Sequence, residues 1–199
     1  MLYTQLKFAI RNLWRNKFYS MINIGGLAVG IAVSMLILVF VGHELSFDRF
    51  HKNADNIYRV KVTFKFGEQE MQGTGMSAYM GPALKESTAG VKDYVRMFTS
   101  FNEKLAFKSD ADHIFYEKRF VLADPSYFKV FSFPFLQGDP RTALDQPGKI
   151  VVSESIAEKY FGDSDVLGRT LTLNNGLNFV ISGVIKNAPS NASLAFDII

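Results

Sequence analysis

Residues 21–42 read MINIGGLAVGIAVSMLILVFVG, and no Asp, Glu, Lys or Arg occurs between Lys17 and Glu44. Only Asn23 and Ser34 are clearly polar in this run. A helix rises about 1.5 Å per residue, so about 20 apolar residues cross the roughly 30 Å hydrocarbon core of a bilayer. We therefore predict a transmembrane helix at residues 20–43. The chain is accordingly expected to be a membrane protein.

The segment before this run is basic and contains no acidic residue. Positive charge beside a span favours the cytoplasmic side. We therefore expect a cytoplasmic N-terminus, with residues 44–199 outside. Apolar residues recur every three to four positions in 1–19, which predicts an amphipathic helix at the surface of an anionic leaflet. The residues expected at this membrane interface are Lys7, Arg11, Trp14, Arg15 and Lys17.

Three other readings of the N-terminal region are open. A cleaved signal peptide has an apolar core of about 7–15 residues and an Ala-x-Ala cleavage site, whereas this core is longer and residues 40–43 read FVGH. A helix buried in a soluble core is the second reading. The third is that residues 1–19 are a plain basic flank without a further role.

A stripe of small residues marks one face of the predicted span. Gly26 and Gly30 form G-x-x-x-G, and Ser34 continues the spacing. Small residues let two helices approach closely in lipid, so we expect Gly26, Gly30 and Ser34 to pack against another helix. Ordinary lipid-facing glycines are the alternative.

Charge and composition bear on two possible functions of the outer domain, nucleic-acid binding and cysteine chemistry. The first 43 residues carry four of the 22 Lys and Arg and none of the 19 Asp and Glu, so the remainder is nearly neutral. The sequence pI of about 9.0 therefore reflects the flank and gives no support for nucleic-acid binding. The absence of cysteine excludes disulfides and thiolate chemistry.

Periodicity predicts a mixture of strands and short helices in residues 44–199. A period of two at 57–66 predicts a half-buried strand with Tyr58, Val60, Val62, Phe64 and Phe66 inward. Extended segments are expected at 91–101, 104–108, 113–123 and 149–152, and a further strand at 194–199. Asn174-Asn175-Gly176 predicts a hairpin joining strands at 169–173 and 177–185.

Capping residues predict where the helices lie. Ser77 and Gly90 bracket a helix at 77–88, and Asp124-Pro125 begins a short one at 126–131. Ser153 and Gly162 bracket a helix at 154–161. The phenylalanines of the second region are expected in a core or a seam between subdomains: Phe128, Phe131, Phe133 and Phe135. Without regular βαβ alternation, the fold class is α+β, with one domain or two subdomains.

No catalytic pattern emerges from the motifs. The phosphate-binding G-x-x-x-x-G-K-[ST] and the G-x-S-x-G elbow are absent, and His43, His51 and His113 lack metal-ligand spacing. We therefore expect neither an enzyme nor a metal or cofactor site.

Several blocks in order resemble the N-terminal portion of a bacterial FtsX/MacB-type ABC transporter permease, in the style common in Bacteroidetes. They span about residues 5–199 and include RNLWRNK at 11–17, INIGGLA at 22–28, FDRFH at 47–51, IYRV at 57–60, ADPSYF at 123–128, SESIA at 153–157, KYFG at 159–162 and PSN at 189–191.

The resemblance implies a periplasmic core domain of α+β fold after the first span, in the bacterial inner membrane. It implies an ABC ATPase subunit or a fused nucleotide-binding domain as partner, together with other permease helices in a dimer and the lipid bilayer. It also implies mechanotransmission, in which ATP hydrolysis moves the periplasmic domain.

The sequence departs from that family in having one predicted span where a permease has at least four. We expect a fragment whose outer domain is incomplete at its C-terminus. The alternative function is a single-pass anchored periplasmic binding or sensor domain, and an anchored enzyme is the weakest reading.

Overall fold

The computed structural model describes residues 2–99, 104–110, 112–163, 165–174 and 176–199. The chain divides into two compact units, Met1–Phe47 and Asp48–Ile199. Each unit is described by itself.

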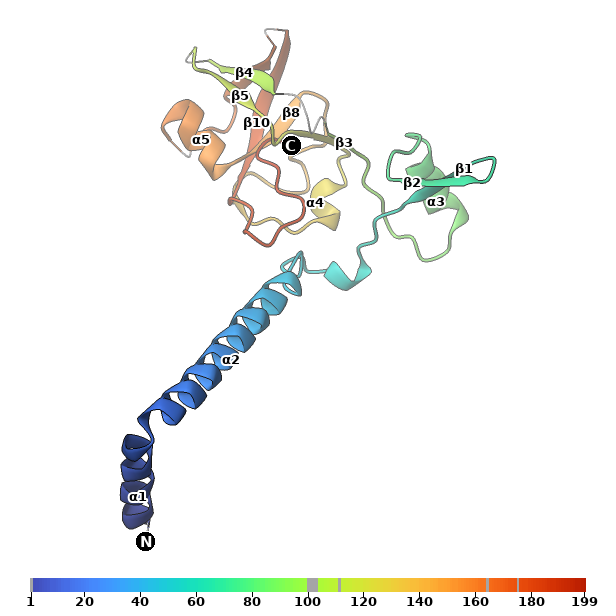
Figure 1. Ribbon diagram of the computed structural model, residues 1–199. Helices are drawn as coiled ribbons and strands as arrows, with labels where there is room; N and C mark the ends of the chain where they lie inside the picture. Colours follow the sequence, from blue (N-terminus) through green and yellow to red (C-terminus); the bar gives the residue numbers. More distant parts are fainter. Residues whose placement is uncertain (1, 100–103, 111, 164, 175) are drawn as a thin grey trace. The chain divides into compact units, whose positions relative to one another are not determined.

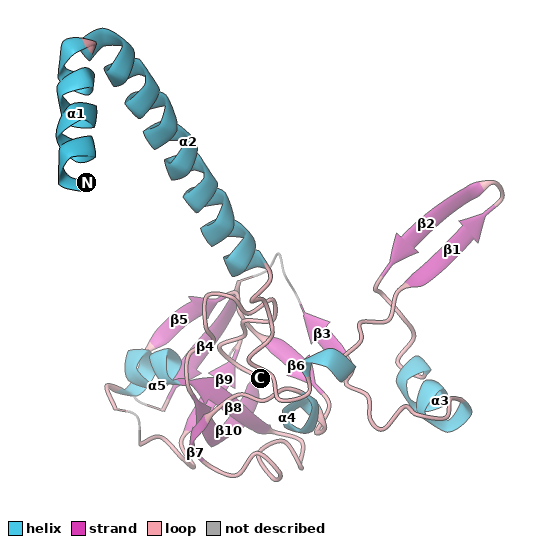
Figure 2. Cartoon of the chain, turned by 90° about the horizontal axis from the view of Figure 1, so that it is seen from below, coloured by secondary structure: helices cyan, strands magenta, loops and turns pink. Residues whose placement is uncertain are grey.

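The first unit consists of two helices joined at one residue. Helix α1 covers Leu2–Arg15 and helix α2 covers Lys17–Glu44 (Figures 1 and 2). Between them, Asn16 leaves the helical region with φ −110° and ψ 51°. The 28 residues of α2 extend about 42 Å, and α2 is long and apolar enough to cross a membrane. Where the membrane begins and ends along α2 stays a prediction.

The second unit is built on a six-stranded mixed sheet of order β5-β4-β9-β10-β7, with β8 paired to β10. Among the strand pairs of this sheet that the structure describes, only the β8–β10 pair is parallel. The strands are β4 (Leu105–Ser109), β5 (Ile114–Glu117), β7 (Phe135–Gln137), β8 (Lys149–Ser153), β9 (Thr170–Leu173) and β10 (Leu177–Ile185). The expected α+β class is confirmed.

Local signals placed the elements between residues 149 and 185 correctly. Helix α5 (Glu154–Phe161) follows β8, and the Ser153 hydroxyl accepts from the amide of Ile156. Gly162 ends the helix with φ 69°, a left-handed conformation that glycine adopts without a Cβ penalty. The predicted hairpin is confirmed as the antiparallel pair of β9 and β10. Asn175 lies outside the described residues.

The predicted half-buried strand at 57–66 is wrong in two respects. Strand β1 covers only Val62–Phe66 and pairs only with β2 (Gln69–Gly73) in a separate hairpin (Figure 2). Its apolar face is not covered by the described residues: Phe64 is 43% exposed and Phe66 67%. Alternation of apolar and polar residues indicates that a strand has two distinct faces. It does not indicate whether another part of the chain packs on the apolar face.

A second small sheet and two short helices complete this unit. Strands β3 (Met97–Thr99) and β6 (Val121–Ala123) pair antiparallel, and α3 and α4 cover Met80–Ser87 and Tyr127–Val130. Both helices were predicted, but the Ser77 cap is wrong. Tyr79 occupies the N-cap position, and the Ser77 hydroxyl accepts only the amide of Tyr79 at 3.4 Å. Of the predicted segment 91–101, residues 100 and 101 lie outside the described ones.

Two hydrophobic clusters form the core. The first joins α5 to the large sheet and includes Phe107, Val152 and Tyr160. The second surrounds α4: Phe128, Phe131 and Phe133 are buried, and Phe135 packs against them partly buried. The prediction that these phenylalanines fill a core is confirmed.

Residues 197–199 lie between strands of both sheets. Ile198 forms β-bridges with Phe120 and with Val152, and Ile199 exchanges two backbone hydrogen bonds of 2.9 Å with Val151. The predicted strand at 194–199 is therefore reduced to bridges near its end.

Candidate functional site

The residues predicted at the membrane interface all lie near the junction of the two helices or on α1. Lys7, Arg11, Trp14 and Arg15 belong to α1, and Lys17 is the first residue of α2. The Lys17 ammonium lies 5.6 Å from the centroid of the Trp14 ring, within the range of a cation–π contact. Their position at a bilayer surface stays a prediction.

The small-residue stripe of α2 presents open space. A Cβ added at Gly26 or Gly30 would meet nothing within 4 Å. Ser34 donates its hydroxyl to the carbonyl of Gly30 at 2.8 Å, so its hydrogen bond is made within the helix. The packing of another helix on this stripe stays a prediction.

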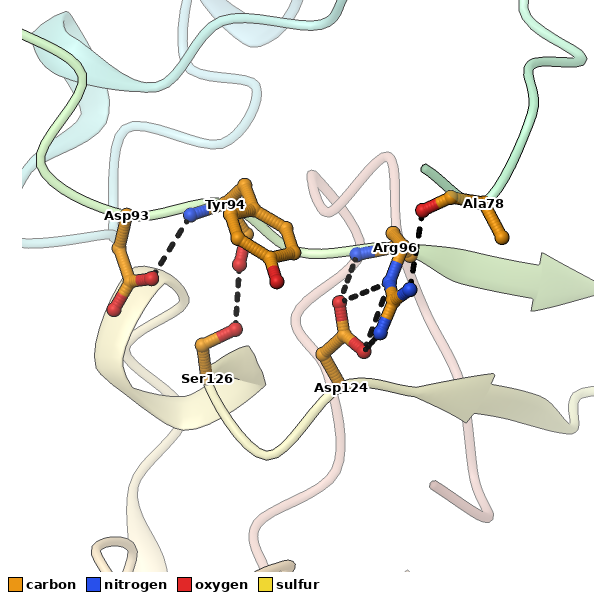
Figure 3. Close-up of polar contacts among 6 residues, drawn as sticks. All are labelled: Ala78, Asp93, Tyr94, Arg96, Asp124 and Ser126. Atoms are coloured by element: carbon orange, nitrogen blue, oxygen red, sulfur yellow. Dashed lines mark hydrogen bonds and ion pairs between the residues drawn. The ribbon is translucent and has the colours of Figure 1, made fainter. Parts of the chain in front are cut away.

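A polar junction forms where β3 begins and β6 ends (Figure 3). Arg96 precedes β3 and Asp124 follows β6, so the two residues extend the pairing of the strands by one position. Arg96 Nη2 donates to Asp124 Oδ1 at 2.7 Å, and Nε donates to Oδ2 at 2.9 Å. The backbones pair as well, since the amide of Asp124 donates to the carbonyl of Arg96 at 3.2 Å. We call Tyr94, Arg96, Asp124, Ser126 and the Ala78 carbonyl the Arg96 junction.

The Arg96 junction ties two helices, α3 and α4, to this sheet. Arg96 Nη1 donates to the carbonyl of Ala78 at 3.1 Å, just before α3. Ser126, the N-cap residue of α4, donates its hydroxyl to the carbonyl of Tyr94. A Cβ at Gly81 would lie 2.5 Å from Tyr94 Cδ2, so the backbone of α3 packs directly on that ring. The junction is therefore a structural tie whose donors and acceptors are satisfied within the chain.

The charge of Arg96 controls Asp124. Burial alone would raise the pKa of Asp124, but hydrogen bonds from the side chain and backbone of Arg96 outweigh it and hold that pKa below its ordinary value. The carboxylate is thus ionised at neutral pH. The predicted role of Asp124 as a helix cap is wrong, because its carboxylate is taken up by Arg96 and Ser126 occupies the N-cap position.

A second set of hydrogen bonds anchors the beginning of the Asp48–Ile199 unit to later parts of the same unit. We call Asp48 and His51, with their partners Asn191, Ser193 and Ser132, the root. The Asp48 amide donates to the carbonyl of Asn191 at 2.9 Å, and Asp48 Oδ1 accepts from the amide of Ser193 at 2.8 Å. His51 is 5% exposed, and its Nδ1 accepts from the amide of Ser132 at 3.0 Å.

His51 sits in an aromatic setting. Its ring centroid lies 4.0 Å from that of Phe50 and within 5.4 Å of those of Phe131 and Phe133. Burial lowers the pKa of His51, while Asp48 acts in the opposite direction. The imidazole is therefore neutral at pH 7, which its role as an acceptor from Ser132 requires.

Another titratable cluster joins α5 to β5. Glu117 Oε1 accepts from Lys159 at 2.7 Å and from the Tyr160 hydroxyl at 3.1 Å. Each of these side chains is hydrogen bonded to another in the set, as in a network that stabilises the fold. Within the described ranges no group of three or more His, Cys, Asp or Glu is placed to hold a metal ion.

Sequence reasoning missed both ties for a physical reason. Arg96 and Asp124 lie 28 positions apart and meet only through the register of β3 and β6. The one available signal for His51 was its place in the FDRFH block, which identified a segment but not a contact.

The family model for the MacB-like periplasmic core domain matches residues 20–199. A domain of a putative permease protein from Porphyromonas gingivalis aligns with a TM-score of 0.55 and 26% identity, covering 65% of this chain and 54% of that chain. The periplasmic region of MacB from Actinobacillus actinomycetemcomitans gives a TM-score of 0.45 at 15% identity, covering 59% and 60%.

The extracellular domain of the noncanonic ABC-type transporter YknZ from Gram-positive bacteria gives a TM-score of 0.42 at 19% identity, covering 62% of this chain and 60% of that one. The chain thus spans between 54% and 60% of the length of these structures. A comparison with curated proteins finds no match. Because the family model covers α2 together with the sheet domain, the chain belongs to the family of the MacB-like periplasmic core domain of ABC transporter permeases.

Proposed function

We propose that the chain is a permease subunit of an FtsX/MacB-like ABC transporter, or its N-terminal part, and that it couples ATP hydrolysis by a partner to movement of a periplasmic domain. The observation that carries this proposal is the continuous family match from residue 20 to residue 199, which takes in the apolar helix and the domain together. The partner is an ABC ATPase, either a separate subunit or a fused domain. Other permease helices complete the assembly.

The root supports transmission of movement along the chain. Helix α2 ends at Glu44, and Asp48 is already hydrogen bonded to residues 191 and 193 of its own unit. His51 is held in the aromatic core a few residues later. Only residues 45–47 separate the helix from these contacts, so we expect a shift of the helix end to be passed to the domain through a short connection.

Orientation is tested first. The chain has no cysteine, so single substitutions at exposed positions give unambiguous labels. Gln5→Cys on α1 is expected to resist a membrane-impermeant maleimide in intact spheroplasts, whereas Glu158→Cys on α5 is expected to react. Labelling of Gln5→Cys from outside would contradict the proposed cytoplasmic N-terminus.

Coupling is tested in the assembled transporter. The tagged chain is expected to co-purify an ABC ATPase, and a fluorophore on Glu158→Cys in nanodiscs should respond to ATP. Asp48→Ala, which removes the carboxylate that accepts from the Ser193 amide, should reduce that response while ATP hydrolysis persists. The matched control is Asp139→Ala, whose carboxylate pairs with its neighbour Arg141. An active ATPase with no ATP-dependent signal in the unaltered chain would overturn the proposal.

A further inference from the structure

Helices α1 and α2 meet at Asn16 (Figure 2), and a shallow, open apolar hollow lies at this junction. Ile10, Leu13 and Trp14 line it from α1, and Met21 and Ile24 line it from α2. These side chains come together because α1 ends at Arg15 and Asn16 breaks the helical path before α2 begins. The apolar faces of two successive helices thus meet around one open space of about 520 Å³.

Two polar residues also line this hollow. Lys17 and Ser20 lie on the first turn of α2, and the Lys17 ammonium stands over the Trp14 ring. No Asp or Glu occurs in the first 43 residues, so the flank supplies no carboxylate to neutralise Lys17. The hollow therefore combines an apolar lining with a cation and a hydroxyl donor.

We propose that this hollow binds one anionic phospholipid. An acyl chain lies along the apolar lining, and the phosphate faces the Lys17 ammonium and the Ser20 hydroxyl. The inference rests on the proposed placement of residues 1–19 at the cytoplasmic membrane surface. A zwitterionic lipid leaves less net negative charge for Lys17, and a free phosphate leaves the apolar lining unfilled, so charge and lining together select an anionic lipid.

The single tryptophan of the chain provides the measurement, because Trp14 lines the hollow. The full chain is purified in detergent, delipidated, and titrated with phosphatidylglycerol or phosphatidylcholine carrying brominated acyl chains, which quench indole fluorescence. We expect saturable quenching by phosphatidylglycerol at one lipid per chain, at lower concentration than by phosphatidylcholine.

A matched pair of variants tests the role of the cation. Lys17→Gln removes the charge at the hollow, and Lys7→Gln removes the same charge elsewhere on the flank. We expect Lys17→Gln to weaken phosphatidylglycerol binding about fivefold, as loss of one basic contact at an anionic surface predicts. Lys7→Gln is expected to bind like the unaltered chain. Equal weakening by both variants would mean diffuse attraction to the flank and would overturn the site.

Two further outcomes separate this site from the proposed function. If alkaline carbonate extracts the chain from membranes, the membrane placement fails and the site fails with it. If the chain stays in the membrane and Trp14 shows no preference for phosphatidylglycerol, only the lipid site is overturned. Trp14 shielded from both lipids would mean that a protein helix covers the hollow, which also overturns it.

Discussion

Arg96 and Asp124 extend the β3–β6 pairing by one position and join it with a fork-shaped ion pair. The side chain of Arg96 and its backbone amide both donate to the same carboxylate. One residue pair thereby fixes the register of a two-stranded sheet that has only three paired positions of its own. Short sheets are marginal without such support.

Asp124→Asn is expected to destabilise the domain. The amide keeps the shape of the carboxyl group but loses the negative charge that pairs with the Arg96 guanidinium. We expect a loss of about 1 kcal/mol in the free energy of unfolding, since Arg96 is partly solvent-exposed. Denaturant unfolding of the full chain in detergent micelles measures it. Arg96→Lys should give a partial loss, because an ammonium cannot reproduce the two parallel hydrogen bonds.

The same pair predicts an acid dependence. The folded pKa of Asp124 lies below its ordinary value, so its contribution to stability is complete above about pH 4 and is lost as pH falls through the folded pKa. A stability profile measured down to pH 2 should be shallower at its acid end in Asp124→Asn. Identical profiles would show that Arg96 does not control this carboxyl group.

His51 predicts a second dependence nearer neutrality. Burial lowers its folded pKa, so the unfolded chain takes up a proton near pH 6.5 while the folded chain does not. Stability is therefore expected to fall as pH drops below about 6.5 and to level off below the folded pKa. His51→Asn, whose side-chain oxygen can accept from the Ser132 amide, should remove this part of the slope. Equal slopes between pH 7.5 and 5 would contradict the prediction.

Gly162 at the end of α5 allows the cost of a left-handed backbone conformation to be measured without a steric clash. Gly162 has φ 69°, and a Cβ there would meet nothing within 4 Å. Gly162→Ala is therefore expected to lower the free energy of unfolding by about 1 kcal/mol through conformation rather than contact. Gly75→Ala is the matched control, because Gly75 also has open space but no positive φ. A similar loss in both variants would point away from the left-handed cap.

Ile198 is expected to be among the most sensitive core positions. It is fully buried and bridges Phe120 and Val152. Ile198→Ala should lower the free energy of unfolding by about 3 kcal/mol, because the cavity adds to the lost burial. Val180→Ala, at a position 45% exposed on β10, should stay within about 0.5 kcal/mol. A loss below about 1 kcal/mol for Ile198→Ala would mean that the core closes around the cavity.

The stripe on α2 is tested in a full-length permease. Gly26→Leu and Gly30→Leu are expected to weaken helix association about fivefold, since a larger side chain keeps the backbones apart. Gly25→Leu adds the same bulk one residue away and points in another direction on the helix. Fluorescence transfer between labelled copies in nanodiscs measures association. Unchanged association in Gly26→Leu and Gly30→Leu would leave these glycines facing lipid.

Features that depend on residues close together in the sequence were predicted correctly, and features that depend on distant residues were not. Ser153, Gly162, Asn174 and Gly176 act on backbone within a few positions, so the sequence pattern located them. The apolar face of β1 was misassigned because burial depends on a second layer. Asp124 resembled a helix cap because its actual partner, Arg96, is brought near only by sheet register.

The root also constrains how the chain is made. Asp48 bonds to Ser193, 145 positions further on, and Val151 bonds to Ile199. During synthesis these late residues emerge after almost all of the sheet, so until then the partners that they supply to Asp48 and Val151 are missing. Contacts of such long sequence separation form slowly, and unpaired strands with exposed apolar surface aggregate. We therefore expect the segments around Asp48 and Val151 to stay incompletely packed until residues 191–199 have been synthesised.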